Sequence, residues 1–197
     1  MGKMIWHSSI EQILQNLGNE AQIKAKLHRK AHRYYNRRNM KYQLPIIILS
    51  VISGSGNFVS AQFPDAQNYI ILGIGLVSMI TSIISSVSQY LKLAPLSESH
   101  KIAYLSWEKF FINIAIQLRM KQNDRIEVKD YLRVIISEYD RLNEISPVIP
   151  QQYLDNESKK ISKQNKKLVI PYFMNGINEI SIYGNSSPIS KLEEQLY

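Results

Sequence analysis

Histidines are the side chains of this chain best suited to metal binding or acid–base chemistry. His28 and His32 are four residues apart, so a helix would place both imidazoles on one face. A zinc site needs three or four ligands, and no carboxylate lies between Glu20 and Asp65. The neighbouring side chains are cationic and would repel a metal ion. The sequence therefore predicts no metal site and no cofactor.

No other pattern predicts catalysis. The chain has no cysteine, which excludes thiolate nucleophiles, disulfides and thiolate zinc sites. His100 follows Ser97 and Glu98, and we expect this segment to be a solvated loop. The paired carboxylates fall at expected helix starts or on polar faces, where capping and solubility explain them: Asp124/Glu127 and Glu138/Asp140. The sequence predicts a protein that is not an enzyme.

The elements around these side chains are dominated by two uncharged segments, 42–64 and 66–91, separated by Asp65. Each is longer than the roughly 18–20 apolar residues that cross a bilayer as a helix. Pro64 and Asp65 favour a turn between them. A buried helix of a soluble protein normally keeps a charged face, which both segments lack. We predict an all-α protein with a two-helix transmembrane hairpin over 42–92. The alternative is a soluble helical module.

Small and polar residues recur within both expected spans. Small residues at three- and four-residue steps let helices approach closely, and their hydroxyls bond across the contact. The same residues can also form the polar lining of a pore assembled from several copies. No Asp, Glu, Lys or Arg lies inside a span, which argues against a proton relay or a charged selectivity ring. The candidates for pore lining or helix packing are Gly54, Gly56, Asn57, Ser78, Ser82 and Ser85.

The positive charge of the chain is concentrated before the first span. Residues 1–41 hold nine Lys or Arg against two Glu, a net charge of +7 in a chain of net charge +8. By the positive-inside rule this flank stays cytoplasmic, and two spans return the C-terminus to the same side. A basic stretch next to a span favours anionic lipid headgroups over nucleic acid. The predicted membrane-surface anchors are Tyr34, Tyr35, Arg37, Arg38 and Lys41.

The flanking segments predict amphipathic helices. Over 1–41 we expect a helix that starts with a capping box at Ser8–Glu11 and is broken or bent at Gly18–Asn19. After a break near Pro95, residues 97–150 predict an antiparallel helical pair that folds onto the N-terminal helix or binds a protein partner. The candidate partner-binding residues are Trp107, Phe110, Val128 and Tyr139.

The segment from 151 to 197 has no firm interpretation. Residues 155–167 are polar and charged and predict a linker or a frayed helix. The last thirty residues mix short apolar runs with Gly and Pro, which allows short strands or a docking tail.

The order of parts resembles the SLATT family of two-transmembrane effector domains that associate with SMODS and SLOG domains. The resemblance rests on the basic run through Tyr34-Tyr35-Asn36-Arg37-Arg38, a span ending Ile52-Ser-Gly-Ser-Gly-Asn-Phe58, Trp107-Glu108 and Ser146-Pro-Val-Ile-Pro150. It covers about residues 20–152 and both ends lie outside it. It implies a membrane effector that oligomerises and opens a pore when a nucleotide-sensing partner is triggered. The chain departs from that setting, because we expect no sensor domain in its 197 residues.

Two functions remain open at this point. The first is an oligomeric two-span membrane protein that forms a pore. The second is a structural membrane anchor whose helical pair or C-terminal tail holds another protein, for example a virion membrane protein that tethers a capsid or scaffold to lipid. Relatives of the SLATT family in large DNA viruses, together with the Ile-, Asn-, Lys- and Tyr-rich composition, favour a viral setting for the second.

Overall fold

The computed structural model describes residues 6–164 and 172–175, and all regular structure in these residues is helical. The prediction of an all-α fold is confirmed. The chain divides into two units, Met1–Tyr153 and Leu154–Tyr197. The helices and short 3-10 turns are α1 (Ser8–Ser60), η1 (Pro64–Ala66), α2 (Gln67–Tyr90), α3 (Leu93–Arg119), η2 (Gln122–Asp124), α4 (Val128–Ile145), α5 (Gln151–Gln164) and α6 (Tyr172–Asn175).

The first helix is continuous across the expected boundary at 41/42. α1 has 53 residues, about 80 Å at 1.5 Å per residue, and joins the basic segment to the first span without a break. The helix continues through Gly18, where a break or bend was predicted. This glycine packs against α3, and an added Cβ would be 3.4 Å from Ile114 Cγ2. Pro45 lies inside α1, so the carbonyl of Lys41 has no intrahelical donor.

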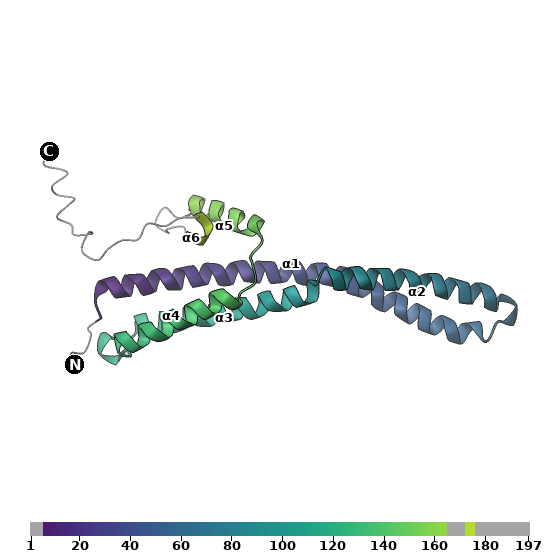
Figure 1. Cartoon of the computed structure of the whole chain (residues 1–197), viewed down its shortest axis with the longest axis horizontal. Coiled ribbons are helices and arrows are strands. Elements are labelled where there is room, and N and C mark those ends of the chain that lie inside the picture. Colours follow the sequence, from purple (N-terminus) through teal and green to yellow (C-terminus); the bar gives the residue numbers. More distant parts are fainter. Residues whose placement is uncertain (1–5, 165–171, 176–197) are drawn as a thin grey trace. The chain divides into compact units, whose positions relative to one another are not determined.

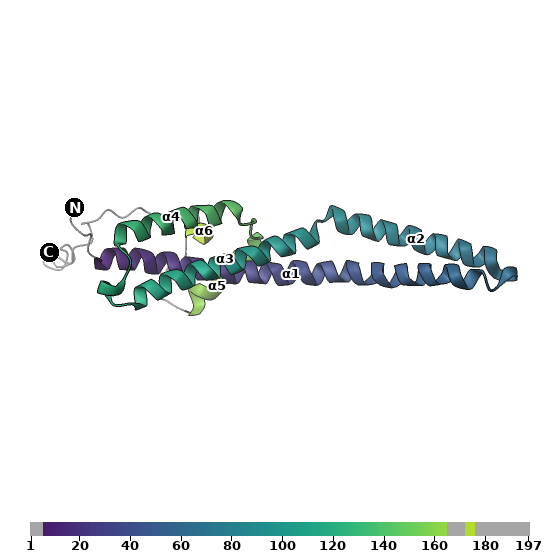
Figure 2. The ribbon, with the colours of Figure 1, turned by 90° about the horizontal axis from the view of Figure 1, so that it is seen from below.

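The second half of α1 and all of α2 form the hairpin (Figures 1 and 2). The short turn η1 joins them, with Pro64 in its first position, where proline is favoured. α2 has 24 residues, about 36 Å, and the uncharged part of α1 from residue 42 to 60 is about 28 Å long. Both helices are long and apolar enough to cross a membrane.

The hairpin ends at Lys92, the only non-glycine residue with positive φ in the described part of the chain (φ 48°). This left-handed residue separates α2 from α3. The predicted break at residues 94–97 is wrong, because α3 already begins at Leu93. Pro95 fits there, since the first turn of a helix has amide groups without intrahelical partners.

The first half of α1, α3 and α4 form a three-helix bundle. α3 runs alongside α1 in both views (Figures 1 and 2). The core has Leu14, Trp107 and Val128 at 0% exposure, with Phe110 and Ile135 almost as buried. These positions recur at three- and four-residue steps, so one face of each helix is apolar. The bundle is therefore stabilised by ordinary hydrophobic burial.

The helix starts differ from the predicted capping boxes. α1 is preceded by His7 and α4 by Glu127, neither with a side-chain cap, and Glu11 forms an ion pair with Arg125 of the loop before α4.

The stop at Ser146-Pro147 is confirmed, because α4 ends at Ile145. Residues 155–164 of the predicted linker or frayed helix lie in α5, and residues 172–175, for which short strands and a docking tail were both open, form α6. The remaining expectations for 168–197 lie outside the described residues.

Candidate membrane hairpin and its basic foot

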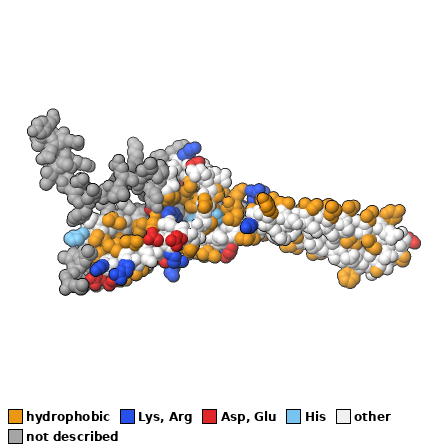
Figure 3. Space-filling model, in the orientation of Figure 1, with side chains coloured by type: hydrophobic (Ala, Val, Ile, Leu, Met, Phe, Trp, Pro, Cys, Tyr) orange, Lys and Arg blue, Asp and Glu red, His pale blue; other side chains and the backbone are white. Residues whose placement is uncertain are grey.

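The hairpin exposes its apolar side chains. In the most apolar stretch of the first candidate span 6% of the residues are buried, and in that of the second none is. Large side chains point outward along both helices: Ile48, Val51, Ile52, Phe58, Leu72, Leu76, Met79, Ile80 and Ile83. Figure 3 shows hydrophobic and uncharged atoms along the hairpin, with Lys and Arg at its foot. A soluble monomer rarely exposes an apolar surface of this extent, so the surface requires an apolar solvent or a partner.

The seam between the two helices is built from small residues. A Cβ added to Gly56 would lie 2.9 Å from Ile74 Cδ1 and Cγ1, so any larger residue there would force the Ile74 side chain to move. The hydroxyl of Ser78 donates to Ser53 Oγ across the seam at 3.4 Å. Gly54 meets nothing within 4 Å and faces away from α2. The candidates therefore separate: Gly56 and Ser78 pack the hairpin, and Gly54 does not.

The remaining polar candidates lie on the open surface. Ser82 donates to the Ser78 carbonyl and Ser86 to the Ser82 carbonyl, each at 2.9 Å, so these hydroxyls are satisfied within α2. Ser85 accepts from Gln89 at 3.2 Å. Asn57 is exposed, and among the described residues its side-chain amide has no hydrogen bond. An amide left unpaired in hydrocarbon is costly, so Asn57 requires water or a polar partner.

The basic residues before the first span divide into two groups. Two of them, Lys24 and Arg29, form contacts between helices of the bundle. Lys24 is 7% exposed, binds Glu20 at 2.9 Å and Asn143 Oδ1 at 2.7 Å, and lies over the Trp107 ring. Arg29 binds both carboxylate oxygens of Glu108, at 2.9 and 2.8 Å. These cations connect α1 to α3 and α4.

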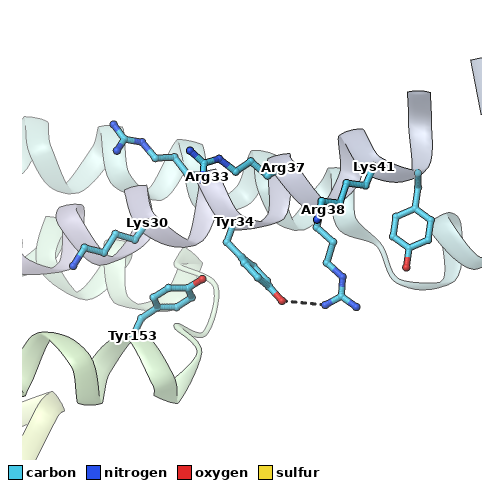
Figure 4. Close-up of a pocket in the computed structure, with 8 residues that line it drawn as sticks. Lys30, Arg33, Tyr34, Arg37, Arg38, Lys41 and Tyr153 are labelled. Carbon is cyan, nitrogen blue, oxygen red and sulfur yellow. Dashed lines mark hydrogen bonds between the residues drawn. The ribbon is translucent and has the colours of Figure 1, made fainter. Parts of the chain in front are cut away.

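The second group surrounds an open hollow of about 800 Å³ on the other face of α1. We call it the collar hollow; its lining is Lys30, Arg33, Tyr34, Arg37, Arg38, Lys41, Tyr42 and Tyr153. Figure 4 shows Tyr34 and Arg38 on the side of α1 toward Tyr153, which comes from the start of α5, and Arg33 and Arg37 on the opposite side of the helix in this view. Arg38 Nη1 donates to Tyr34 Oη at 3.0 Å, and this bond raises the pKa of Arg38. Four of the five predicted anchors thus line one hollow.

Tyr35, the fifth predicted anchor, faces the bundle instead. Its ring stacks on His100 with centroids 5.4 Å apart and an interplanar angle of 9°. His100 is 1% exposed, so the expectation of a solvated loop is wrong. The reason is helical phase: Tyr34 and Tyr35 differ by 100° around α1, so only one can face the hollow.

A histidine pair joins α1 to α3 beneath this tyrosine. His28 Nδ1 and His100 Nδ1 are 2.9 Å apart, and His28 is 2% exposed. One ring must donate and the other accept, so the accepting ring is neutral and the pair cannot carry two charges. His32 contacts the carbonyl of Ser97 at 2.9 Å through Nδ1. Within the described residues, no group of three or more His, Asp or Glu side chains is arranged to hold a metal.

Burial disfavours protonation of the pair. Desolvation, followed by the charge of His100 and then Lys24, lowers the pKa of His28 from 6.5 to about 3. Desolvation, followed by His32, lowers the pKa of His100 to about 4. The pair therefore connects the helices as neutral rings, and sequence spacing alone did not bring His100 to His28.

The residues predicted to bind a partner are inside the bundle. Trp107 and Val128 are fully buried and Phe110 is 3% exposed. Tyr139 packs edge-on against Trp107 and donates to Glu20 Oε1 at 2.5 Å. Of the two predicted uses of this helical pair, the structure has the one in which it folds onto α1. A partner cannot contact these buried side chains while the bundle is closed.

A different apolar stripe lies on the opposite face of α3. Ile102, Leu105, Ile112 and Ile116 are 48–54% exposed. At 100° per residue they cluster on the side away from the core positions. Their steps of three, seven and four follow the heptad spacing of helix–helix seams, with Lys109 in the gap. This second apolar period was not predicted from the sequence, because its positions alternate with those of the core stripe along the same helix.

Comparisons with family models, curated proteins and solved structures find no match to this chain.

Proposed function

We propose that this chain is a two-span integral membrane protein that associates with copies of itself, and that the assembly conducts through polar faces of its hairpins. The observation that carries the proposal is the uncharged, outward-facing apolar surface of the hairpin. At about 30 Å, the hydrocarbon core of a bilayer matches the length of the uncharged part of α1 and is somewhat shorter than α2. Both ends of the chain then lie on the cytoplasmic side, with the basic residues.

Self-association is supported in two places. In the membrane, the exposed amide of Asn57 needs a polar environment, which a neighbouring hairpin or a water-filled pore supplies. Outside the membrane, the apolar stripe on α3 offers a helix–helix seam at heptad spacing. The pore function is also what the resemblance to SLATT effectors implies.

The test of conduction is dye leakage from vesicles that contain the purified chain. We expect leakage that is lost in the variant N57L/S82L/S85L, which changes polar candidates outside the hairpin seam. The matched control N16L/S99L/S137L makes the same three changes on the exposed surface of the bundle and should leak like the unmodified chain. Resistance to carbonate extraction shows that each variant is inserted. Inserted protein that never leaks, at any oligomer size, would overturn the pore.

A structural anchor is the second candidate, and the α3 stripe is the observation that favours it. The same exposed side chains can bind another protein, and the hairpin then serves only as attachment to lipid. Leakage separates the two candidates. The variant L105K/I112K should reduce self-association in the first case and leave the oligomeric state unchanged in the second.

A further inference from the structure

The collar hollow concentrates Lys and Arg side chains. Lys30, Arg33, Arg37 and Lys41 follow one another at steps of three, four and four residues, which places them on one face of α1. Arg38 lies beside them between Tyr34 and Tyr42. In the described part of the chain, no ion pair joins Arg33, Arg37, Arg38 or Lys41 to a carboxylate. The hollow is therefore strongly electropositive.

Its donors suit a phosphate group. Arginine presents several N–H donors in a planar fork that binds phosphate oxygens in pairs. The Tyr34 hydroxyl accepts from Arg38, so its own hydrogen is available to donate to a ligand. With no acidic side chain in the lining, the hollow disfavours cations and zwitterions with an exposed amine.

The position of the hollow indicates where such a phosphate would come from. Lys41 and Tyr42 lie immediately before Leu44, the first large apolar residue of the span. In a bilayer this level holds the headgroup phosphates. The lining side chains then meet a lipid headgroup from the side of the helix, while α1 continues into the hydrocarbon.

We propose that the collar hollow is a binding site for a lipid whose headgroup ends in a phosphomonoester, such as phosphatidic acid or a phosphorylated inositol lipid. A phosphomonoester carries up to two negative charges near pH 7 and three oxygen acceptors, whereas a phosphodiester lipid carries one charge. The inference rests on the proposed membrane function and adds a specific ligand class to it.

The test measures binding of a fluorescent short-chain phosphatidic acid to the full chain purified in detergent. Fluorescent phosphatidylglycerol of the same chain length, a phosphodiester lipid without an amine, is the single-charge probe. We expect about tenfold tighter binding of phosphatidic acid, the factor that one additional charge-assisted hydrogen bond supplies. Equal affinities for the two probes would overturn the proposal.

Two variants separate the site from general attraction. R37Q/R38Q should remove the preference for phosphatidic acid, whereas R119Q/R133Q, an equal charge change on exposed positions of α3 and α4, should keep it. Y34F changes no charge and should weaken the preference several-fold by removing one donor. Identical binding by R37Q/R38Q and R119Q/R133Q would contradict the site.

Two further measurements are needed. One distinguishes a lipid from a soluble phosphate, and the other separates failure of this inference from failure of the proposed membrane function. Glycerol phosphate at the same concentration should compete poorly; competition as strong as that of phosphatidic acid would overturn a lipid site in favour of a soluble phosphate. Carbonate extraction reports insertion independently. An inserted chain without headgroup preference contradicts this inference alone, and a chain that binds the probe but does not insert contradicts the proposed membrane function.

Discussion

The two halves of α1 place apolar side chains in opposite directions. From Ser8 to about Lys41 the helix is highly charged, and its apolar residues, such as Leu14 and Leu27, are fully buried. From Tyr42 to Ser60 it has no charge, and residues such as Val51 and Phe58 are 62% and 81% exposed. The backbone is the same continuous helix in both halves.

The difference teaches that burial and hydrophobicity need not go together in one element. In the bundle, neighbouring helices remove apolar surface from water, and the polar face is solvated. In the hairpin, one neighbour covers only a narrow seam around Gly56, and the rest of the surface needs an apolar solvent or a further protein partner. In the proposed membrane protein, the residues between Lys30 and Lys41 lie at the boundary between water and lipid.

The largest expected effect on stability comes from replacing a large side chain by alanine in each of the two regions, the bundle and the hairpin. Trp107→Ala should reduce the free energy of unfolding of the bundle by about 3–5 kcal/mol, because it leaves a cavity among Phe110 and Tyr139. Phe58→Ala removes an exposed ring of the hairpin and should change it by less than about 0.5 kcal/mol. Urea unfolding in detergent, followed by circular dichroism and by Trp6 fluorescence, which both variants keep, measures both. Equal losses would contradict the contrast.

The next effect comes from adding a charge. Met79→Lys, at a 64% exposed position near the middle of α2, should make insertion less favourable by about 3 kcal/mol. Val134→Lys on α4 is similarly exposed, at 59%, and should leave insertion unchanged. The inserted fraction after synthesis in the presence of membranes is the measurement. Tolerance of lysine at position 79 would place this part of α2 in water.

Acid should weaken the bundle and not the hairpin. The pKa values of His28 and His100 are lowered in the fold, so their stabilising contribution is complete above pH 6.5 and is lost as the pH falls toward about 3–4. The expected loss is about 1 kcal/mol per histidine for each pH unit below 6.5.

Unfolding curves at pH 7.5 and 5.5 test this prediction. The variant H28N/H100N should lose most of the difference between the two pH values. The variant H7Q, which changes an exposed histidine, should keep it. A pH dependence that survives in H28N/H100N would assign it to other groups.

The smallest effect resolves the hairpin seam. Gly56→Val should weaken the contact of α1 with α2 by about 1–3 kcal/mol, because its side chain would overlap Ile74. Gly54→Val meets open space and should have little effect. Cross-linking of S53C with S78C reports the contact, since the two native hydroxyl oxygens are 3.4 Å apart. The same yield in both glycine variants would contradict the assigned seam.

The sequence by itself determined the helical fold class, the position of the two uncharged helices and the stop at Ser146. Each of these depends on local properties: the length of an apolar run, the absence of charge, and a proline that cannot continue a helix. The basic face before the span was also legible, because Arg37, Arg38 and Lys41 adjoin it in sequence.

Only the tertiary structure decided which neighbours each helix face meets. The contact of His28 with His100 and the burial of Trp107 depend on α3 packing against α1 across more than seventy residues of chain. Whether Tyr34 or Tyr35 faces the collar hollow depends on the rotation of α1 relative to α3. Periodicity in the sequence shows that a helix has an apolar face. Which other helix packs against that face depends on contacts between segments distant in sequence, and no local pattern encodes those contacts.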